Sequence, residues 1–263
     1  MEESGIVRLL SLCPSITESL AALGASGELV GITRYCVHPA EALKDVPRVG
    51  GTKNPDLAAI RAAKPDLVFC NAEENRGEDI AALTREFAVD VSHPRTVAEV
   101  PALLRHFGAV AGKREESEKI ASKVEEALER VEEEARLTGL RFRFVYLIWK
   151  DPWMTVGPRT YVADLLRRVG GTLSLEGSPN ADAPDYPVTS ENAILLSRPD
   201  VLILPDEPYP FAGKDAAFWR QRLPSACRVV RVKGEDFCWH GVRTLQGLVA
   251  IGQLARQLSI SPA

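Results

Sequence analysis

The sequence predicts an α/β protein of two lobes, each built on a mainly parallel sheet, joined by one long helix. Three observations support this fold class. Segments that are apolar at every position alternate with helical patterns along the chain. A pattern of helix, Pro-Asp pair and strand occurs once in each half. Residues 113–138 contain neither proline nor glycine.

The repeated pattern indicates one sheet in each half. In the first half residues 58–63 precede the Pro-Asp pair and the apolar run 67–70 follows it. In the second half residues 192–197 and 201–204 take the same places. Proline ends a helix, and a run that is apolar throughout is typical of a strand covered on both faces. We therefore expect a parallel sheet with helices on both faces in each half.

The other expected elements follow from the same rules. Two helices are predicted to end at Gly24 and Gly170, because glycine commonly terminates a helix. A closing amphipathic helix is predicted over 245–258. Further strands are predicted at 6–12, 28–32, 141–148 and 228–232.

The segment between the halves has a narrow apolar stripe on an otherwise charged helix. The stripe recurs every three or four residues at Ile120, Val124, Leu128, Val131 and Ala135. A helix of this length spans roughly 35–40 Å. We expect a strut between two lobes, and a surface helix on a single domain is the alternative. The predicted division is an N-terminal α/β lobe (1–112), a bridging helix (113–138) and a C-terminal α/β lobe (139–263).

The composition is that of an ordinary globular chain and excludes several partners. Of 263 residues, 45% are hydrophobic and 26% are charged, and the mean hydropathy is -0.08. Lys and Arg number 32 against 36 Asp and Glu, which gives a net charge of -4. No basic field attracts nucleic acid or anionic lipid, and no apolar run is long enough to insert into a membrane.

The N-terminus and the cysteines bear on location. The first residues lack the positive region, long apolar stretch and cleavage site of a secretory signal. The five cysteines show no closely spaced pairs: Cys13, Cys36, Cys70, Cys227 and Cys238. We expect a cytoplasmic protein with free thiols, and a periplasmic or cell-surface protein if a leader has been removed.

Enzymatic signatures are missing from the sequence. It has no P-loop, dinucleotide-binding, H-E-x-x-H or G-x-S-x-G motif. The four histidines are scattered, and among them His240 lies in a loop rich in aromatic residues. We expect no enzyme, no catalytic residue, no metal ligand and no intrinsic cofactor.

Loops that follow predicted strands are the candidate site. In open parallel sheets, ligands bind beyond the carboxyl ends of the strands. Polar and aromatic residues gather in four such loops, at 33–39, 71–76, 149–153 and 235–240. Simpler explanations remain: Ser15 or Thr17 can cap a helix, and the acidic residues of 71–76 favour a helix N-terminus.

Several segments together resemble the substrate-binding proteins of the cobalamin and iron-siderophore type, most of all the vitamin B12-binding branch. They are Leu10–Glu18, Val30–Gly31, Tyr35–Pro39, Val49–Thr52 and the two helix, Pro-Asp and strand repeats. The resemblance runs from about Ile6 to Leu258. It implies the class III substrate-binding-protein fold, in which two Rossmann-like lobes are joined by a rigid helix and hold the ligand in the cleft between them.

The resemblance also implies residue roles. Aromatic side chains in this group hold the flat corrin ring, and Tyr35, Trp149 and Tyr186 match such positions. Two further aromatic positions fall on Thr52 and Asn71, so the first lobe is more polar than its relatives.

A partner is implied as well. Transporter-associated relatives carry a glutamate on each lobe that docks on a membrane permease, and the matching positions here are Ala58 and Asn192. Asp56 and Glu191 lie nearby and could substitute. Because the match is imperfect, we expect an intracellular binding protein rather than one that docks on an ABC permease.

We expect non-enzymatic binding of cobalamin or a related corrinoid in the interlobe cleft. The first alternative is a haem or ferric-siderophore receptor, for which the plausible cations are Arg34, Lys53, Arg76, Lys150 and Arg243. The second is a divalent metal site or enzyme using Glu73, Glu74, Asp236 and His240. A module that has lost its ligand is the third. The expected ligand-binding residues are Tyr35, Thr52, Lys53, Asn71, Glu73, Glu74, Asn75, Trp149, Trp153, Tyr186, Asp236, Phe237, Trp239 and His240.

Overall fold

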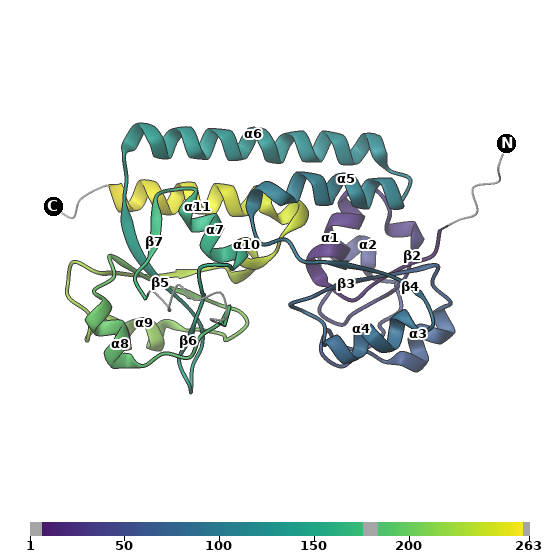
Figure 1. The fold of residues 1–263 in the computed structure, drawn as a ribbon, viewed down its shortest axis with the longest axis horizontal. Coiled ribbons are helices and arrows are strands. Elements are labelled where there is room, and N and C mark those ends of the chain that lie inside the picture. The colour runs from purple at the N-terminus through teal and green to yellow at the C-terminus, as the bar shows by residue number, and fades with distance from the viewer. Residues whose placement is uncertain (1–6, 176–183, 260–263) are drawn as a thin grey trace. The chain divides into compact units, whose positions relative to one another are not determined.

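The computed structural model describes residues 7–175 and 184–259, which form two compact units (Figure 1). Of the described residues, unit 1 contains 7–94, 98–125 and 240–243. Unit 2 contains 95–97, 126–175, 184–239 and 244–259. The long helix is shared between the two units, so the lobe boundaries expected at 112 and 139 stay a prediction.

Unit 1 holds a four-stranded parallel sheet of order β2-β1-β3-β4. Its strands are β1 (Leu9–Ser11), β2 (Leu29–Ile32), β3 (Leu67–Asn71) and β4 (Ala88–Ser92). Its helices are α1 (Pro14–Ala22), α2 (Ala40–Leu43), α3 (Leu57–Ala63), α4 (Gly77–Thr84) and α5 (Val100–Val110). The strands predicted in this half are confirmed, whereas β4 was not predicted. This edge strand is mostly not buried, so it lacks the continuous apolar run that marks the others.

The core of unit 1 lies on both faces of its sheet. Leu9 and Phe69 belong to one buried cluster, which includes Phe107 of α5. Leu10 and Val68, one residue along each strand, belong to a second cluster. Successive side chains of a strand point to opposite faces. This alternation explains why β1 and β3 carry apolar side chains on both faces up to Ser11 and Asn71, the polar residues that end the two strands.

Unit 2 holds a second, mixed sheet. Its strands are β5 (Phe142–Trp149), β6 (Met154–Thr155), β7 (Gly171–Leu173), β8 (Val201–Pro205) and β9 (Arg228–Val232). The pairings of β5 with β7 and β8, and of β8 with β9, are parallel, whereas β6 is antiparallel to β5. Its helices are α7 (Tyr161–Arg167), α8 (Glu191–Ser197), α9 (Gly213–Arg220), α10 (Gly234–Cys238) and α11 (Thr244–Ser259). The strands and the closing helix expected in this half are confirmed.

The repeated Pro-Asp pair has the same function in both units. Asp66 accepts a hydrogen bond from the backbone N–H of Arg8, which precedes β1, at 2.8 Å. Asp200 accepts one from the N–H of Arg143 in β5 at 2.6 Å. The residues before the pairs, Lys64 and Arg198, have φ of 44° and 46° and end α3 and α8 in the left-handed conformation. Each pair therefore ties the end of a helix to the first strand of its sheet.

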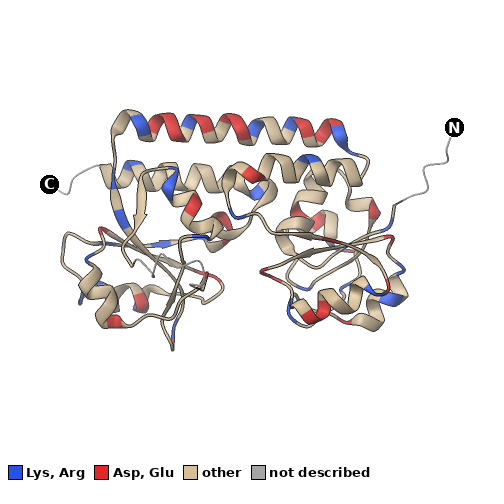
Figure 2. Ribbon diagram, in the orientation of Figure 1, with Lys and Arg blue, Asp and Glu red and all other residues tan. Residues whose placement is uncertain are grey.

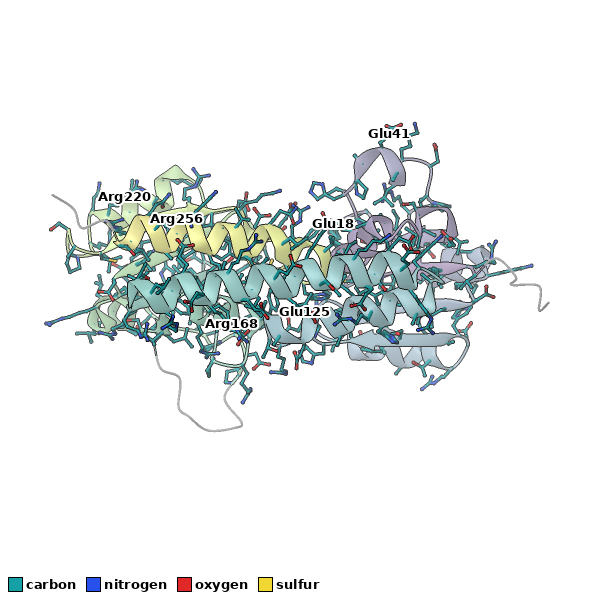
Figure 3. All side chains as sticks on the ribbon, turned by 90° about the horizontal axis from the view of Figure 1, so that it is seen from above. Glu18, Glu41, Glu125, Arg168, Arg220 and Arg256 are labelled. Carbon is teal, nitrogen blue, oxygen red and sulfur yellow. The ribbon has the colours of Figure 1, made fainter. Side chains whose placement is uncertain are left out.

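The long helix α6 (Arg114–Thr138) is charged along its length (Figure 2). In unit 1, Arg105 of α5 pairs with Glu118 and Glu125 of α6 at 2.8 and 2.7 Å. In unit 2, Arg256 of α11, labelled in Figure 3, pairs with Glu134 of α6 at 2.9 Å. These pairs are partly exposed and each contributes little stability, about 0–1 kcal/mol. The residues of α6 that are buried, and that pack the helix against the rest of the protein, are Ser117, Ala121, Val124, Ala127, Leu128 and Ala135.

A short segment from late in the chain, His240–Arg243, packs in unit 1; we call it the return segment. The backbone N–H of Val242 donates to Ser19 Oγ of α1 at 3.1 Å. Arg243, 8% exposed, donates through Nε to Glu18 of α1 at 3.0 Å, and a second guanidinium N–H reaches the other carboxylate oxygen. Gly241 has a φ of 81°. The return segment is thus fixed to α1 by hydrogen bonds and a bidentate ion pair.

Substituting Gly241 with alanine is expected to destabilise the protein by about 2 kcal/mol. An added Cβ would lie 2.1 Å from Ser19 Oγ, and the φ of 81° is unfavourable for any residue with a side chain. Gly27→Ala is the matched control, since a Cβ there meets no atom within 4 Å. Urea unfolding measures both. Equal stability of the two variants would contradict this account of the return segment.

Candidate functional site

The candidate site residues of unit 1 gather at the carboxyl ends of β1 and β3. Asn71 is the last residue of β3 and is 3% exposed. Its Oδ1 accepts from the backbone N–H of Glu73 and of Glu74 at 2.9 and 3.1 Å. Its Nδ2 donates to the carbonyl of Ser92 at 3.2 Å and faces His240 Nε2 at 3.1 Å. The two backbone N–H groups fix which end of the amide is oxygen.

This orientation determines the protonation of His240. Asn71 Nδ2 is a donor only, so His240 Nε2 must accept, and the imidazole is neutral with its proton on Nδ1. Ser15 Oγ lies 3.4 Å from the same nitrogen. Burial lowers the pKa of His240 to about 4, and the charge of His93 acts in the same direction. In the structure His240 Nε2 therefore serves as the acceptor of the Asn71 amide N–H.

Asn75 and Lys53 connect neighbouring loops of unit 1. Asn75, 4% exposed, donates to the carbonyls of Leu12 and Thr52 at 3.1 and 3.0 Å. The amine of Lys53 donates to the carbonyl of Glu73. Thr52 is itself buried. The structure therefore brings these predicted residues together, and Asn75 serves there as a brace that holds the loops in place.

The two acidic residues after β3 differ in environment. Glu73 lies 3.3 Å from His93 Nε2. Burial raises the pKa of Glu74, and the neighbouring Glu73 raises it further, whereas Lys53 opposes both effects. The protein around the Glu74 carboxylate thus disfavours its charged form, although the residue itself is exposed.

Tyr35 is the exposed aromatic residue of this end of unit 1. Its side chain is 52% exposed, and the guanidinium of Arg34 lies 5.6 Å from its ring centroid. A Cβ on Gly51 would lie 3.2 Å from its ring, so the glycine permits the close approach of the two loops.

In unit 2, Trp149 ends β5 and is 41% exposed. Its ring makes an edge-to-face contact with Tyr209 at 5.6 Å between centroids, and Tyr209 in turn contacts Phe211 at 4.7 Å. An exposed aromatic ring held by a second ring offers apolar area at low entropic cost. Trp149 and Tyr209 form a surface suited to a flat ligand.

Trp153 has a different environment from Trp149. It packs against the apolar core of unit 2 and contacts Phe211 at 6.3 Å and Trp219 at 5.1 Å. The amine of Lys150 lies 5.6 Å from its ring centroid and pairs with Asp215, which is 1% exposed, at 3.0 Å. Trp153 therefore stabilises the core beneath the Trp149 loop.

The remaining predicted residues of unit 2 are Tyr186, which precedes α8, and Asp236, Phe237 and Trp239, which lie in or directly after α10. Phe237 is 2% exposed and packs on Tyr146 at 5.9 Å. Trp239, Asp236 and Tyr186 are half-buried. The indole N–H of Trp239 donates to the carboxylate of Glu207. A buried Phe237 serves packing, whereas Trp239 is oriented by a neighbouring carboxylate.

Sequence reasoning missed the loop after β8. It contains Asp206, Glu207 and Tyr209, directly beyond the buried run of that strand. Asp206 accepts from the backbone N–H of Gly234 at 2.7 Å, and Cys238 Sγ lies 3.4 Å from Glu207 Oε1. The rule used for the other loops, polar and aromatic residues directly after a buried strand, also identifies this one.

Each cation considered for an anionic ligand is already engaged. Arg76 pairs with Asp79, Lys150 with Asp215 and Arg243 with Glu18. Lys53 donates to a backbone carbonyl, and Arg34 donates to Asn54 Oδ1 at 3.3 Å. An incoming carboxylate would have to break these contacts or meet the nearby carboxylates.

The alternative metal site finds no support in the described residues. Within residues 7–175 and 184–259, no group of three or more His, Cys, Asp or Glu side chains is placed so that it could hold a metal ion. No disulfide joins the cysteines of these ranges.

The acidic residues near the permease-docking positions are already engaged in contacts within the chain. Asp56 caps α3, and Glu191 pairs with Arg222 at 2.7 Å.

The two units, each with polar and aromatic loops at the carboxyl ends of its sheet, define the class of two-lobed solute-binding proteins. The chain belongs to the periplasmic binding protein family, which matches residues 9–215. Within the described part of the chain, no helix has the length and apolarity needed to cross a membrane.

The individual relatives share little sequence identity with this chain, although they match nearly its whole length. A vitamin B12-binding protein of Pectobacterium carotovorum subsp. carotovorum (strain PC1) is 26% identical over 97% of this chain and 90% of its own. The periplasmic vitamin B12-binding protein BtuF of Vibrio cholerae has a similar structure, with a TM-score of 0.82 and 19% identity over 97% of this chain and 98% of its own. The haem-binding protein RhuT of Roseiflexus sp. RS-1 has a TM-score of 0.78 and 20% identity over 97% and 100% of the two chains. These likenesses bear out the expected class III fold. The expectation that the loops of the two units face a common slot stays a prediction.

Proposed function

We propose that this chain is a non-enzymatic binding protein for cobalamin or a related corrinoid. The observation that carries the proposal is the pair of exposed aromatic side chains at strand ends, Tyr35 in unit 1 and Trp149 in unit 2. Exposed aromatic rings at ligand-binding edges suit a flat, largely apolar macrocycle. Vitamin B12-binding proteins among the relatives support the same ligand class.

The charges favour a corrinoid over haem or a siderophore. Haem carries two propionates and many ferric siderophores are anionic, whereas the corrin periphery carries neutral amides. Three of the five candidate cations are paired with carboxylates, as described above. The buried side chains that hold the unit 1 loops of the proposed site, including Asn71 and Thr52, are neutral amides and hydroxyls and add no positive charge.

The residues proposed for the ligand are Tyr35, Lys53, Glu73 and Glu74 in unit 1, and Trp149, Tyr186, Asp236 and Trp239 in unit 2. Thr52, Asn71, Asn75 and His240 are proposed to hold the unit 1 loops in place, and Trp153 and Phe237 those of unit 2.

The family supports a periplasmic location, the alternative considered above, over the cytoplasmic one. The engagement of Asp56 and Glu191 supports the expectation that permease docking through these residues is absent.

A visible-absorption titration tests the proposal. Cyanocobalamin is expected to give a saturable, one-to-one change with a Kd on the order of 1 μM or below. Haemin, carried through the same titration, is expected to bind at least about tenfold more weakly, because its propionates meet paired cations. Saturable binding of haemin with no response to cyanocobalamin would assign the protein to the alternative class.

A further inference from the structure

A buried hydroxyl in unit 2 has no partner. Tyr146, on β5, is 1% exposed, and among the described residues its hydroxyl makes no hydrogen bond. An unsatisfied buried polar group costs free energy, so each one calls for an explanation. Burial raises the pKa of Tyr146 well above its usual value, and therefore the hydroxyl keeps its proton and remains a donor.

Tyr146 lies in the surroundings of α10. Its ring packs on Phe237 at 5.9 Å between centroids, and the next residue, Cys238, has its Sγ 3.4 Å from Glu207 Oε1. The charges that act on the Tyr146 hydroxyl are those of Cys238, Glu207, Asp206 and Tyr186, in that order. Asp206 and Glu207 follow directly on β8, at the carboxyl end of the sheet where ligands bind. Glu207 is half-buried and Asp206 is exposed, so this group extends from the buried hydroxyl to the surface.

The Glu207 carboxylate is held in position but retains capacity to accept. It accepts hydrogen bonds from the Trp239 indole and the Cys238 thiol. A carboxylate offers about four acceptor directions, so a further donor can be bound. A donor with no partner among the described residues and an acceptor with remaining capacity therefore belong to the same group of contacts around α10.

We propose that Tyr146 and Glu207 form a subsite that recognises a primary carboxamide on a propionamide arm of the ligand. The amide carbonyl accepts from the Tyr146 hydroxyl, and the amide N–H donates to the Glu207 carboxylate. A propionamide rather than a shorter acetamide is required because the hydroxyl is buried, and neighbouring side chains change rotamer to admit the arm.

The same subsite rejects a carboxylate. A carboxylate in place of the amide brings two acceptors and no donor, and it places a negative charge beside Glu207 and Asp206. Like charges in a partly buried site are unfavourable, and the Glu207 acceptor would be left without its donor. The inference rests on the proposed function, because it assigns one arm of the corrinoid to these residues.

The test uses cyanocobalamin and its three monocarboxylic acids, each with a different propionamide hydrolysed. In the wild-type protein, one of the three is expected to bind about tenfold more weakly than cyanocobalamin, and the other two within a few-fold of it. Glu207→Gln, which keeps size but removes the charge, is expected to abolish this difference. Glu191→Gln on α8 removes the same charge from an exposed pair and is expected to leave the difference unchanged.

Tyr146→Phe separates a recognition role from a structural one. Removing an unpartnered hydroxyl is expected to leave the melting temperature of the unliganded protein unchanged or raise it, while affinity for cyanocobalamin falls about five- to tenfold. The control is Tyr161→Phe, because Tyr161 bonds Thr244 Oγ1 at 2.8 Å; it is expected to lower the melting temperature without changing the discrimination between ligands.

The outcomes distinguish the two proposals. Equal binding of all three acids and cyanocobalamin would overturn the amide subsite and leave the corrinoid function standing. A selective loss that persists in Glu207→Gln would also overturn it. No binding of cyanocobalamin would overturn the proposed function, and the subsite with it.

Discussion

Replacing Trp149 with alanine is expected to weaken cyanocobalamin binding by about 30-fold, or about 2 kcal/mol. The side chain is 41% exposed and is supported from one side by Tyr209, so its free face is available to a flat ligand. Because little of the side chain packs in the core, the free energy of unfolding is expected to change by less than about 1 kcal/mol. Absorption titration and urea unfolding measure the two quantities.

Trp153→Ala gives the opposite pattern. This side chain packs among Phe211, Phe218 and Trp219, so its removal is expected to lower the free energy of unfolding by about 3 kcal/mol. Trp153→Phe, which retains ring contacts, is expected to bind cyanocobalamin nearly as well as the wild type. A Trp149→Ala variant that is unstable but binds normally would reverse the roles assigned to the two residues.

Acidification is expected to destabilise the protein through His240. Its pKa is about 4 in the folded protein against 6.5 for an ordinary histidine. Between these values the unfolded chain binds a proton that the folded protein does not, so stability falls as the pH drops from about 6.5 to about 4. The contribution reaches about 3 kcal/mol at the lower end. Protonation of His240 Nε2 would also place its N–H against the Asn71 Nδ2 amide group, so that two donors would face each other.

His240→Gln isolates this effect from other titrations. Glutamine can still accept from Asn71 through its side-chain oxygen but does not titrate. Urea unfolding at intervals between pH 7 and pH 4 is expected to show a shallower loss of stability in the variant than in the wild type. Parallel curves for the two proteins would contradict the neutral, accepting imidazole.

Much of the fold could be predicted because the two sheets are covered on both faces. Burial of nearly every residue of β1, β3 and β8 produces nearly continuous apolar runs, and such runs can be identified without an alignment. The edge strand β4 and the two-residue strand β6 could not be predicted, since neither carries a continuous apolar run. The packing of the return segment in unit 1 depends on contacts between residues more than 220 positions apart, which local patterns do not contain.

The candidate site was predicted less completely than the fold. Position after a strand identified Tyr35, Asn71 and Trp149, but it could not distinguish an exposed side chain from a buried one. Trp149 and Trp153 are four residues apart in one loop and differ in what they contact. The role of His240 depends on the orientation of the Asn71 amide, which is set by two backbone N–H groups. Such orientations follow from tertiary geometry and not from residue type.

Hydrogen–deuterium exchange with and without cyanocobalamin tests the central claim most directly, that a corrinoid binds at the carboxyl ends of the strands. Saturating ligand is expected to slow exchange in peptides covering residues 33–39, 71–76, 149–153 and 206–211, while α3 and α8 exchange as before. Protection that is absent from these four loops, or confined to the opposite ends of the sheets, would contradict the account.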